Sequence, residues 1–225
     1  MISAFEFALS EAAKVLKDGG VIALPTDTLY GLVATVRNVH KIYNIKQRNF
    51  SKPCGLFISD VGQVKKWCST KLEESTLTRL LPGPVTLLFF RSDHLPSEFN
   101  QGIKTVGIRI PKHDFVTQLT KKLTAPLAQT SANLSGDRNP RCIEDFCDLW
   151  SKLDLVIDGG EIKGSPGHLS GEGSTVVDMS YEGTYSIIRD GTARTKTEEI
   201  LRDCGLVART DGELFAQSIN TLPGK

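Results

Sequence analysis

The stretch Val21-Ile22-Ala23-Leu24-Pro25-Thr26-Asp27-Thr28-Leu29-Tyr30-Gly31-Leu32 decides how this sequence is interpreted. Its first four residues are all apolar, which predicts a strand buried on both faces. Pro25 ends that run, and hydroxyl and carboxyl side chains follow at Thr26, Asp27 and Thr28. One interpretation is an ordinary turn, because these residue types favour turns. The other is a polar pocket floor at the rim of a sheet, and the segment alone leaves both open.

Apolar spacing along the rest of the chain predicts intermingled helices and strands. Helices are expected where apolar residues recur every three or four positions, in residues 5–16, 39–45, 61–67, 74–81, 115–123, 143–150 and 197–204. Strands are expected at residues 21–24, 55–59, 85–90, 105–110, 126–130, 155–157, 175–177 and 186–189. There is no internal repeat and no long linker. The sequence therefore predicts one α/β domain with a mixed, twisted sheet flanked by helices over residues 1–207, and a polar C-terminal tail, 208–225. Residues 162–173 are rich in Gly, Ser and Pro and are expected to form a mobile loop.

Composition narrows the class of protein. The chain has 225 residues, 40% hydrophobic and 24% charged, which is typical of a globular protein with its own core. A net charge of +1 gives no overall reason to expect binding to nucleic acid or membrane. Five cysteines without Cys-x-x-Cys spacing indicate free thiols, and Glu6 and Glu11 interrupt any signal peptide. We expect a cytoplasmic protein, although a longer form could reach mitochondria.

Lys46-Gln47-Arg48 closes a predicted helix, and Lys52 follows. These cations could be a solvated helix C-terminus, where positive charge offsets the helix dipole. Alternatively they could surround a triphosphate, with the guanidinium binding a phosphate in bidentate fashion. No Gly-x-x-x-x-Gly-Lys-Ser/Thr loop is present, so any nucleotide would be held without a P-loop. The four histidines have no metal-ligand spacing, and no residue is predicted as a metal ligand.

Three further segments carry polar groups at the ends of predicted strands. Thr105-Val106-Gly107-Ile108-Arg109 places Thr105 and Arg109 on one strand face, where an arginine needs an anionic partner from the protein or from a ligand. Ser131-Ala132-Asn133 leaves a sheet edge of the kind at which α/β folds bind ligands, although such clusters are often plain loops. Ser174-Thr175-Val176-Val177-Asp178 is a weak signal when taken alone.

Taken together and in this order, these motifs resemble the YrdC-like family of threonylcarbamoyl-AMP synthases. The resemblance runs from about the first helix to Gly191. It implies an open α/β sheet with a concave, positively charged face. It also implies an enzyme that condenses L-threonine, bicarbonate and ATP into threonylcarbamoyl-adenylate, releasing pyrophosphate, for the threonylcarbamoyladenosine modification of tRNA.

The resemblance also implies roles for individual residues. Catalytic roles fall on Lys46, Arg48, Ser131 and Asn133. Contacts with ATP fall on Arg48, Lys52, Thr105, Ser131, Asn139 and Arg189, and contacts with threonine on Thr28, Arg109 and Ser174. Mg²⁺ is expected to be held mainly by the triphosphate and water. Two positions depart from the family pattern: Asp190 stands where proline is usual, and Phe57 stands where many relatives carry a polar residue.

Two other functions remain as alternatives. The same basic face could bind structured RNA, tRNA or double-stranded RNA, with affinity falling steeply as salt rises. A related domain also serves a different carbamoyl transfer in hydrogenase maturation proteins, but the zinc-finger and acylphosphatase segments expected there are absent from this sequence. For the synthase reading, a tRNA threonylcarbamoyl transferase complex of the KEOPS type is the expected downstream partner.

Overall fold

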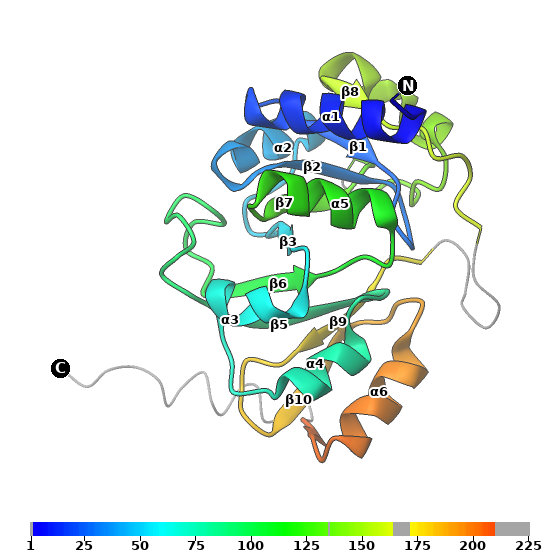
Figure 1. Ribbon diagram of the computed structural model, residues 1–225. Helices are drawn as coiled ribbons and strands as arrows, with labels where there is room; N and C mark the ends of the chain where they lie inside the picture. Colours follow the sequence, from blue (N-terminus) through cyan, green and yellow to red (C-terminus); the bar gives the residue numbers. More distant parts are fainter. Residues whose placement is uncertain (1, 135, 164–171, 210–225) are drawn as a thin grey trace.

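Eleven short strands join into one mixed sheet (Figure 1). The computed structural model describes residues 2–134, 136–163 and 172–209. The strands are β1 (Ile22–Leu24), β2 (Gly31–Thr35), β3 (Gly55–Phe57), β4 (Cys68–Ser69), β5 (Val85–Arg91), β6 (Thr105–Arg109), β7 (Leu127–Ser131), β8 (Leu155–Val156), β9 (Thr175–Asp178), β10 (Thr184–Arg189) and β11 (Val207–Ala208). Their order across the sheet is β11-β10-β9-β5-β6-β3-β7-β2-β1-β8, with β4 beside β5. The sheet contains parallel pairs (β1 with β8, β3 with β6, β5 with β9, β10 with β11) as well as antiparallel ones, so the predicted mixed sheet is confirmed.

Helices lie against both faces of this sheet. They are α1 (Ala4–Lys17), α2 (Val39–Lys46), α3 (Val64–Trp67), α4 (Glu74–Leu80), α5 (Asp114–Leu123) and α6 (Arg194–Asp203), with the 3₁₀ helices η1 (Val36–Asn38), η2 (Val61–Gln63) and η3 (Ile143–Lys152). In Figure 1, α1 and α5 lie side by side toward one end of the sheet, and α4 and α6 lie together at the other. The start of α1 is set by a capping box, in which Ser3 Oγ accepts from the Glu6 amide and Glu6 accepts from the Ser3 amide, both at 3.1 Å.

Alternation along the strands divides the core into two parts. Leu32 and Ala34 of β2 pack on one face, together with Ile108 of β6 and Leu87 of β5, against α2, α4, α6 and η3. Val33, between the first two, points to the opposite face and packs there with Leu9, Leu16, Phe115 and other residues of α1 and α5. Successive side chains of a strand point to opposite faces, so a strand with apolar residues at every position must be covered on both. This explains why β1 and the centre of β2, Leu32 to Ala34, are apolar at every position.

Helices α1 and α5 cover only part of that second face. On β6 the residues that face away from the larger core are Gly107 and Arg109, and on β5 they are Thr86 and Leu88. These side chains lie beyond the reach of α1 and α5, and they line a cavity instead. The fold thus leaves one half of one sheet face without a helix, and that half is where a ligand can reach the strands.

Several elements differ from the prediction, among them the short elements β4 and η1, which were not expected. Strand β2 was not predicted, because its apolar residues directly follow the polar turn and were interpreted as part of that turn. The helix expected at residues 143–150 is a 3₁₀ helix, interrupted where Phe146 adopts φ −137° and ψ 29°. Ala208 pairs within β11 rather than opening a tail, and Arg209 forms an ion pair with Asp178 at 2.8 Å. Residues 210–225, and 164–171 of the predicted loop, lie outside the described residues.

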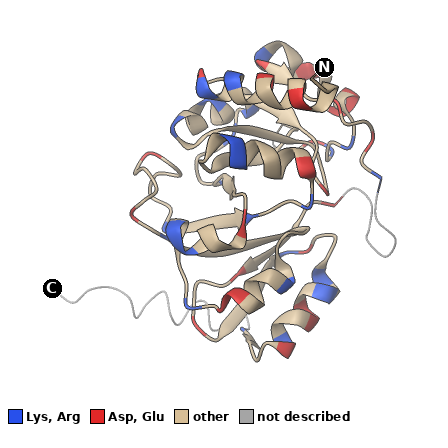
Figure 2. Cartoon of the chain, viewed as in Figure 1, with Lys and Arg blue, Asp and Glu red and all other residues tan. Residues whose placement is uncertain are grey.

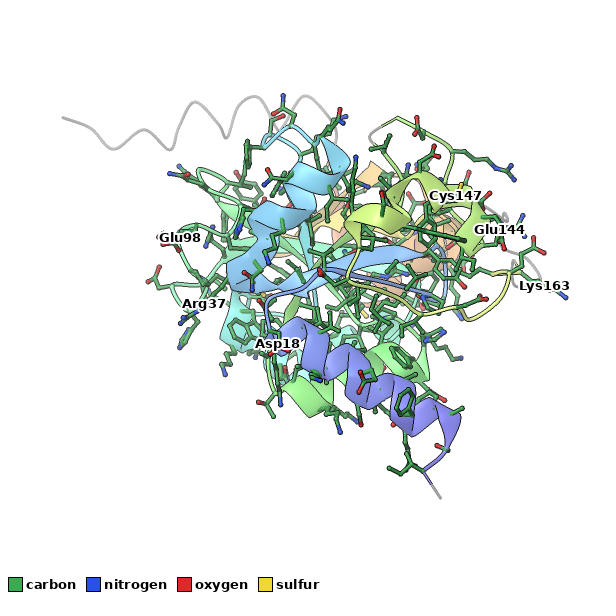
Figure 3. All side chains as sticks on the ribbon, turned by 90° about the horizontal axis from the view of Figure 1, so that it is seen from above. Asp18, Arg37, Glu98, Glu144, Cys147 and Lys163 are labelled. Carbon is green, nitrogen blue, oxygen red and sulfur yellow. The ribbon has the colours of Figure 1, made fainter. Side chains whose placement is uncertain are left out.

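The surface carries charges of both signs. Figure 2 shows Lys and Arg interspersed with Asp and Glu over the helices, in keeping with the net charge of +1. Exposed charged residues such as Asp18, Arg37 and Glu98 lie at the periphery when the molecule is seen from above (Figure 3), as does the free thiol of Cys147. Among the described residues, no helix is long and apolar enough to cross a bilayer. The local arrangement of charge therefore says more about the site than the overall charge does.

Close backbone packing at Gly191 yields a first prediction. A β-carbon there would lie 2.4 Å from the Ser174 carbonyl carbon and from the Thr175 amide, so the two segments must separate to admit it. Gly191→Ala should lower the free energy of unfolding by about 1–3 kcal/mol, as overpacking does elsewhere. Gly62→Ala is the matched control, because its β-carbon would meet only the flexible end of the Asp60 side chain, at 3.2 Å. Denaturant unfolding measures both, and equal stability of the two variants would contradict the prediction.

Candidate active site

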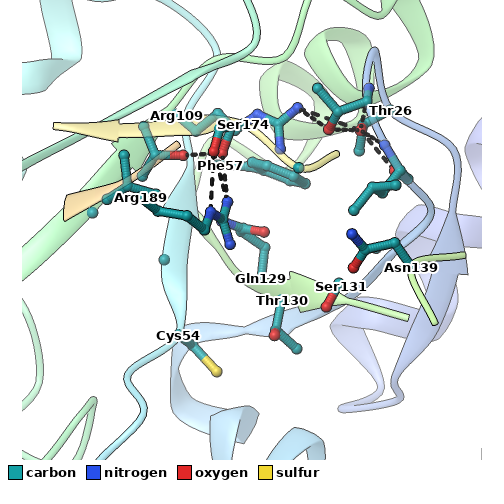
Figure 4. Close-up of a pocket in the computed structure, with 18 of the residues that line it drawn as sticks. Thr26, Cys54, Phe57, Arg109, Gln129, Thr130, Ser131, Asn139, Ser174 and Arg189 are labelled. Carbon is teal, nitrogen blue, oxygen red and sulfur yellow. Dashed lines mark hydrogen bonds between the residues drawn. The ribbon is translucent and has the colours of Figure 1, made fainter. Parts of the chain in front are cut away.

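The uncovered half of the sheet holds a cavity of about 460 Å³ (Figure 4). Its floor is made by β3, β5, β6, β7 and β9, and its walls by the turn after β1 and by the chain that follows α2. Small-molecule sites usually measure about 300–1,000 Å³. Of the residues that the sequence nominated, Thr28, Arg48, Arg109, Ser131, Asn139, Ser174 and Arg189 line this cavity. Segments as far apart as Thr28 and Arg189, 161 positions along the sequence, therefore meet in one place.

The turn after β1 is both a turn and a wall of the cavity. Thr26 Oγ1 accepts from the amides of Thr28 and Leu29, at 3.1 and 3.2 Å, and donates to the Leu29 carbonyl at 2.7 Å. This local network fixes the turn, as Thr side chains commonly do. It leaves the hydroxyl of Thr28 directed at Arg109, from which it accepts a hydrogen bond of 2.7 Å. The two interpretations of this segment are compatible, because Thr26 builds the turn and Thr28 faces the cavity.

Arg109 ends β6 and is almost fully buried. Its Nη2 donates to Asp27 Oδ1 at 2.6 Å and to Thr28 Oγ1 at 2.7 Å, while Asp27 Oδ2 accepts from the Lys112 amide at 3.0 Å. Its guanidinium also lies over the ring of Phe57, 5.8 Å from the centroid. The Nε donor is buried and has no hydrogen-bond partner. An arginine has five donors, so this one retains capacity for a second carboxylate.

Lys46 ends α2 but does not extend into solvent. Its side chain is 1% exposed, and Nζ donates to the carbonyl oxygen of Ser131, a residue of the cavity wall. Gln47 adopts a left-handed conformation at φ 48°, which ends the helix and turns the chain. Burial, reinforced by the charge of Arg48, lowers the pKa of Lys46 to about 7. The solvated helix end that the sequence also allowed is therefore wrong for Lys46.

Arg48 holds the chain that follows α2. Its Nε donates to the carbonyl of Lys52 at 2.8 Å and its Nη2 to that of Pro53 at 3.2 Å. The residue itself lines the cavity, but Lys52 is exposed and does not line it. These bonds fix the path of residues 48–53, because a charged donor anchors two backbone carbonyls at once.

Ser174 joins two strands on the opposite side of the cavity. Its hydroxyl lies 2.8 Å from that of Thr86 on β5, and its carbonyl accepts from Arg189 Nη2 at 2.8 Å and from Nε at 3.2 Å. Arg189 is thus held on the end of β10 by a backbone group. Thr86 was not nominated from the sequence, although the alternation along β5 would have placed it on this face.

Four nominated residues do not line the cavity: Lys46, Lys52, Thr105 and Asn133. Thr105 begins β6 two positions before the cavity-lining Gly107 and does not line the cavity. Asn133 is buried behind Ser131, where Nδ2 donates to the Asp137 carbonyl at 2.9 Å and Oδ1 is buried without a partner. Lys46 likewise reaches the wall from behind. Asn133 and Lys46 can hold the cavity-lining residues in position. Thr105 and Lys52 could contact a ligand only if that ligand extends beyond the cavity.

Positive charge gathers in the cavity. Burial lowers the pKa of Arg189, and the guanidiniums of Arg109 and Arg48 lower it further. Such mutual destabilisation is relieved when an anion binds. Carboxylates near these cations are themselves paired: Asp27 is bound to Arg109, and Asp190, which lines the cavity, is bound to Arg194, at 2.6 Å in both cases. The site is therefore built to accept anionic groups.

Hydroxyl, amide and apolar groups complete the lining. Gln129 of β7, Leu88 of β5, Val176 of β9 and Phe57 of β3 face the cavity and were not predicted to do so. The register shows why they meet: β7 pairs with β3 so that Gln129 stands opposite Gly55. Short strands such as β3 give too little periodicity for their inward face to be identified from sequence.

The described residues bring no three His, Cys, Asp or Glu side chains together that could hold a metal ion. Glu172 also lines the cavity and forms no ion pair with another described residue. Mg²⁺ prefers to keep several waters and to bind phosphates with one or two carboxylates. The lining residues therefore fit a metal ion that binds together with a polyphosphate better than a metal ion coordinated by protein side chains alone.

Comparison with known proteins supports the geometry. A family model described as "Telomere recombination" (Sua5_yciO_yrdC) matches residues 14–191, most of the chain. The chain belongs to this family. Within the Sua5/YrdC family, threonylcarbamoyl-AMP synthase of Bos taurus is 42% identical over 203 residues, covering 89% of this chain and 74% of that protein. The Homo sapiens protein of the same name is 42% identical over 198 residues, covering 87% of this chain and 71% of its own.

Solved structures of the Sua5/YrdC family share the fold. The crystal structure of P. abyssi Sua5 complexed with L-threonine superposes with a TM-score of 0.78 at 26% identity. It covers 90% of this chain, which in turn spans 59% of that archaeal chain. The structure of E. coli YciO gives a TM-score of 0.73 at 23% identity and supports the fold alone. The fold class expected from the sequence is thereby confirmed.

The low pKa of Lys46 predicts how stability depends on pH. The folded-state pKa of about 7 lies below the 10.5 of a solvated lysine, so between these two pH values the unfolded chain binds more protons than the folded one. The free energy of unfolding should therefore rise with pH in that window. Relative to Lys46→Met, the wild type should gain about 2 kcal/mol between pH 7 and pH 9. Denaturant unfolding of both proteins across this range is the measurement. A pH-independent difference would mean that the buried amine titrates normally.

Proposed function

We propose that this protein is a threonylcarbamoyl-AMP synthase, which condenses L-threonine, bicarbonate and ATP into threonylcarbamoyl-adenylate and pyrophosphate. The observation that carries the proposal is the convergence of Arg48, Arg109 and Arg189 on one cavity of about 460 Å³ in a member of the Sua5/YrdC family. The named relatives are threonylcarbamoyl-AMP synthases. The P. abyssi Sua5 structure is a complex with L-threonine.

The chemistry requires the groups that the cavity offers. The neutral threonine amine attacks the carbon of carbon dioxide and loses a proton, or attacks that of bicarbonate with loss of water, and either route forms a carbamate. A carbamate oxygen then attacks the α-phosphorus of ATP, and the bond to the leaving pyrophosphate breaks. Both reactants are anions, so nearby cations reduce their repulsion and stabilise the charge that develops during attack. Holding the two together supplies much of the remaining acceleration.

Roles for individual residues are part of the proposal. Arg109, with Thr28 and Ser174, binds threonine, and its free donor capacity suits the substrate carboxylate. Arg48, Ser131, Asn139 and Arg189 contact ATP, while Lys46 and Asn133 act from behind the wall of the cavity. Lys52 and Thr105 would touch only the parts of ATP that extend beyond it. Mg²⁺ would enter with the triphosphate and neutralise part of its charge.

Burial disfavours the alternative of a structured-RNA-binding module. Lys46 and Arg109 are 1% and 6% exposed, so neither can reach the phosphates of a bulky double strand. Cations that bind nucleic acid backbones normally stand on the surface. We infer that tRNA and a KEOPS-type transferase complex act on the product downstream. The cysteines among the described residues are free thiols, which is typical of a reducing compartment such as the cytoplasm.

Pyrophosphate release by the purified protein tests this function. Release from ATP should need both L-threonine and bicarbonate, and threonylcarbamoyl-adenylate should appear in equal amount by mass spectrometry. Release that is indifferent to threonine would indicate another nucleotidyl transfer. No release, together with salt-sensitive RNA binding, would favour the binding module.

Arg109→Ala should separate the two substrates. Losing hydrogen bonds to a carboxylate costs about 1.5–3 kcal/mol, so the KM for threonine should rise roughly 10–100-fold. The KM for ATP should change by much less, since Arg109 lies at the Thr28 side of the cavity. Steady-state kinetics with each substrate varied in turn measure the effect. Equal increases in both KM values would contradict a carboxylate-binding role.

Lys46→Ala and Arg48→Ala should each abolish detectable adenylate formation. Removing a single group that stabilises transition-state charge costs about 10²–10³ in kcat, and these changes also disturb the cavity wall. Arg37→Ala, an exposed arginine on η1, is the charge-matched control and should leave activity unchanged. Circular dichroism checks that the variants fold. Near-normal turnover in either site variant would remove it from the catalytic set.

A further inference from the structure

Asp190 places a carboxylate in the wall of a cavity that otherwise gathers positive charge. It directly follows Arg189 at the end of β10, and both residues line the cavity. In Figure 4, Arg189 lies among the cavity side chains, bonded to Ser174. A carboxylate in this place can act against an anionic ligand in two ways, because it can pair with the cation or repel the ligand. The charge of Asp190 therefore has to be held away from the cavity if Arg189 is to attract an anion.

Arg194, on α6, binds this carboxylate from outside the cavity. Its Nη1 donates to both carboxylate oxygens of Asp190, to Oδ2 at 2.6 Å, and its Nε donates to Glu198 Oε1 at 3.3 Å. Arg194 itself does not line the cavity. Hydrogen bonds between a guanidinium and a carboxylate are short and strong, because both groups are charged. Bonds on two sides fix the Arg194 side chain, which in turn holds the Asp190 carboxylate at the start of α6.

The backbone that follows Asp190 is fixed to the neighbouring strand. The Thr192 amide donates to the Gly173 carbonyl at 3.1 Å, and the Ala193 amide donates to Thr175 Oγ1, also at 3.1 Å. These bonds keep position 190 at the cavity wall, so the chain cannot carry the carboxylate away by moving its backbone. Only the side chain of Asp190 can direct its charge toward the cavity or away from it.

The pair could instead serve only to stabilise α6. Arg194 is the first residue of that helix and Asp190 precedes it by four positions, where a carboxylate offsets the positive end of the helix dipole. The side chains of Asp190 and Arg194 are 62% and 48% exposed, however, and exposed ion pairs contribute little to stability. Stabilisation also does not account for the place of Asp190 in the cavity wall. The two explanations differ in what they affect, because one predicts a change in unfolding and the other a change in ligand affinity.

We propose that Arg194 is a positioning residue, which binds Asp190 so that the cations of the cavity stay available to an anionic ligand. The inference deepens the proposed function and rests on it for the identity of that ligand as ATP. Arg194 touches no ligand itself. Without it, the Asp190 carboxylate stands unpaired beside Arg189, where it offsets the positive charge that attracts the ligand.

Binding of ATP, measured by isothermal titration calorimetry without threonine or bicarbonate, tests the inference. Arg194→Met should weaken ATP binding about 3–10-fold, because an unpaired negative charge then stands beside Arg189. Arg194→Lys keeps the positive charge and should weaken binding less. Asp190→Asn should tighten binding far more in the Arg194→Met background than in the wild type, since only there is the carboxylate unpaired. Lys196→Met removes the same charge from an exposed position two residues along α6, and as the matched control it should have a much smaller effect.

Several outcomes would overturn the inference and leave the proposed function intact. Equal ATP affinity of Arg194→Met and the wild type would do so, even if thermal unfolding shows a loss of stability, because the pair would then serve only the helix. Equal weakening by Arg194→Met and Lys196→Met would do so as well, since the loss of any nearby cation would then be sufficient. An equally large effect on the binding of adenosine, which carries no charge, would also contradict it.

Other outcomes bear on the proposed function. The predicted pattern of ATP affinities, in a protein that releases no pyrophosphate with threonine and bicarbonate, would support the inference and overturn the function. Absence of ATP binding by the wild type would overturn both.

Discussion

Positive charge that gathers at one cavity and that the chain neutralises only in part is the constraint on which this site depends. Arg48, Arg109 and Arg189 share one cavity, and the third has its pKa lowered by burial and by the other two. Asp27 offsets part of this charge by accepting from Arg109 at 2.6 Å. The remainder is tolerated because the surrounding sheet and helices hold these side chains where they are. An anionic ligand relieves the repulsion, so the charge that destabilises the empty cavity contributes to binding.

Lys46 shows what this arrangement costs. Its ammonium is 1% exposed and its pKa is about 7, because burial and Arg48 both disfavour the charged form. Binding of a phosphate nearby would raise that pKa again and draw a proton from solvent. The charge of this residue therefore lowers the stability of the folded protein while it favours binding of an anionic ligand, a combination that is common at functional sites.

The position of the cavity follows from how the helices are distributed. Helices α1 and α5 cover one half of a sheet face with Leu9, Leu16, Phe115 and Leu119, and stop there. Beyond them the strands carry Gly55 and Gly107, which have no side chains, and Gln129, whose carboxamide lies over the first of these. A sheet face that is neither packed nor filled exposes its backbone and the ends of its strands, which is where open α/β folds bind ligands.

Much of this could be predicted from local sequence. Long apolar stretches such as residues 85–90, and the spacing of apolar residues in 5–16, indicated strand and helix correctly, because they depend on neighbours in the chain. Strand β2 was missed because Leu32, Val33 and Ala34 are a run too short to stand apart from the turn before them. The sequence also did not predict that Lys46 is buried, since cations at the end of a helix are equally compatible with an exposed helix C-terminus. For Thr26 and Thr28, local chemistry predicted the turn, and only Arg109, more than 80 positions away, gives the second hydroxyl its place at the cavity.

By itself, the sequence determined the type and approximate limits of most elements, the mixed α/β class, and a set of polar motifs that resemble one family. Only the tertiary structure decided which of those polar residues meet. It brought Thr28, Arg109, Ser131 and Ser174 to one cavity, left Lys52 and Thr105 outside it, and added Thr86 and Gln129. The physical reason is that periodicity reports which face of an element is buried, whereas strand order and register decide what lies opposite that face. Those pairings join residues far apart in the chain, and no local pattern encodes them.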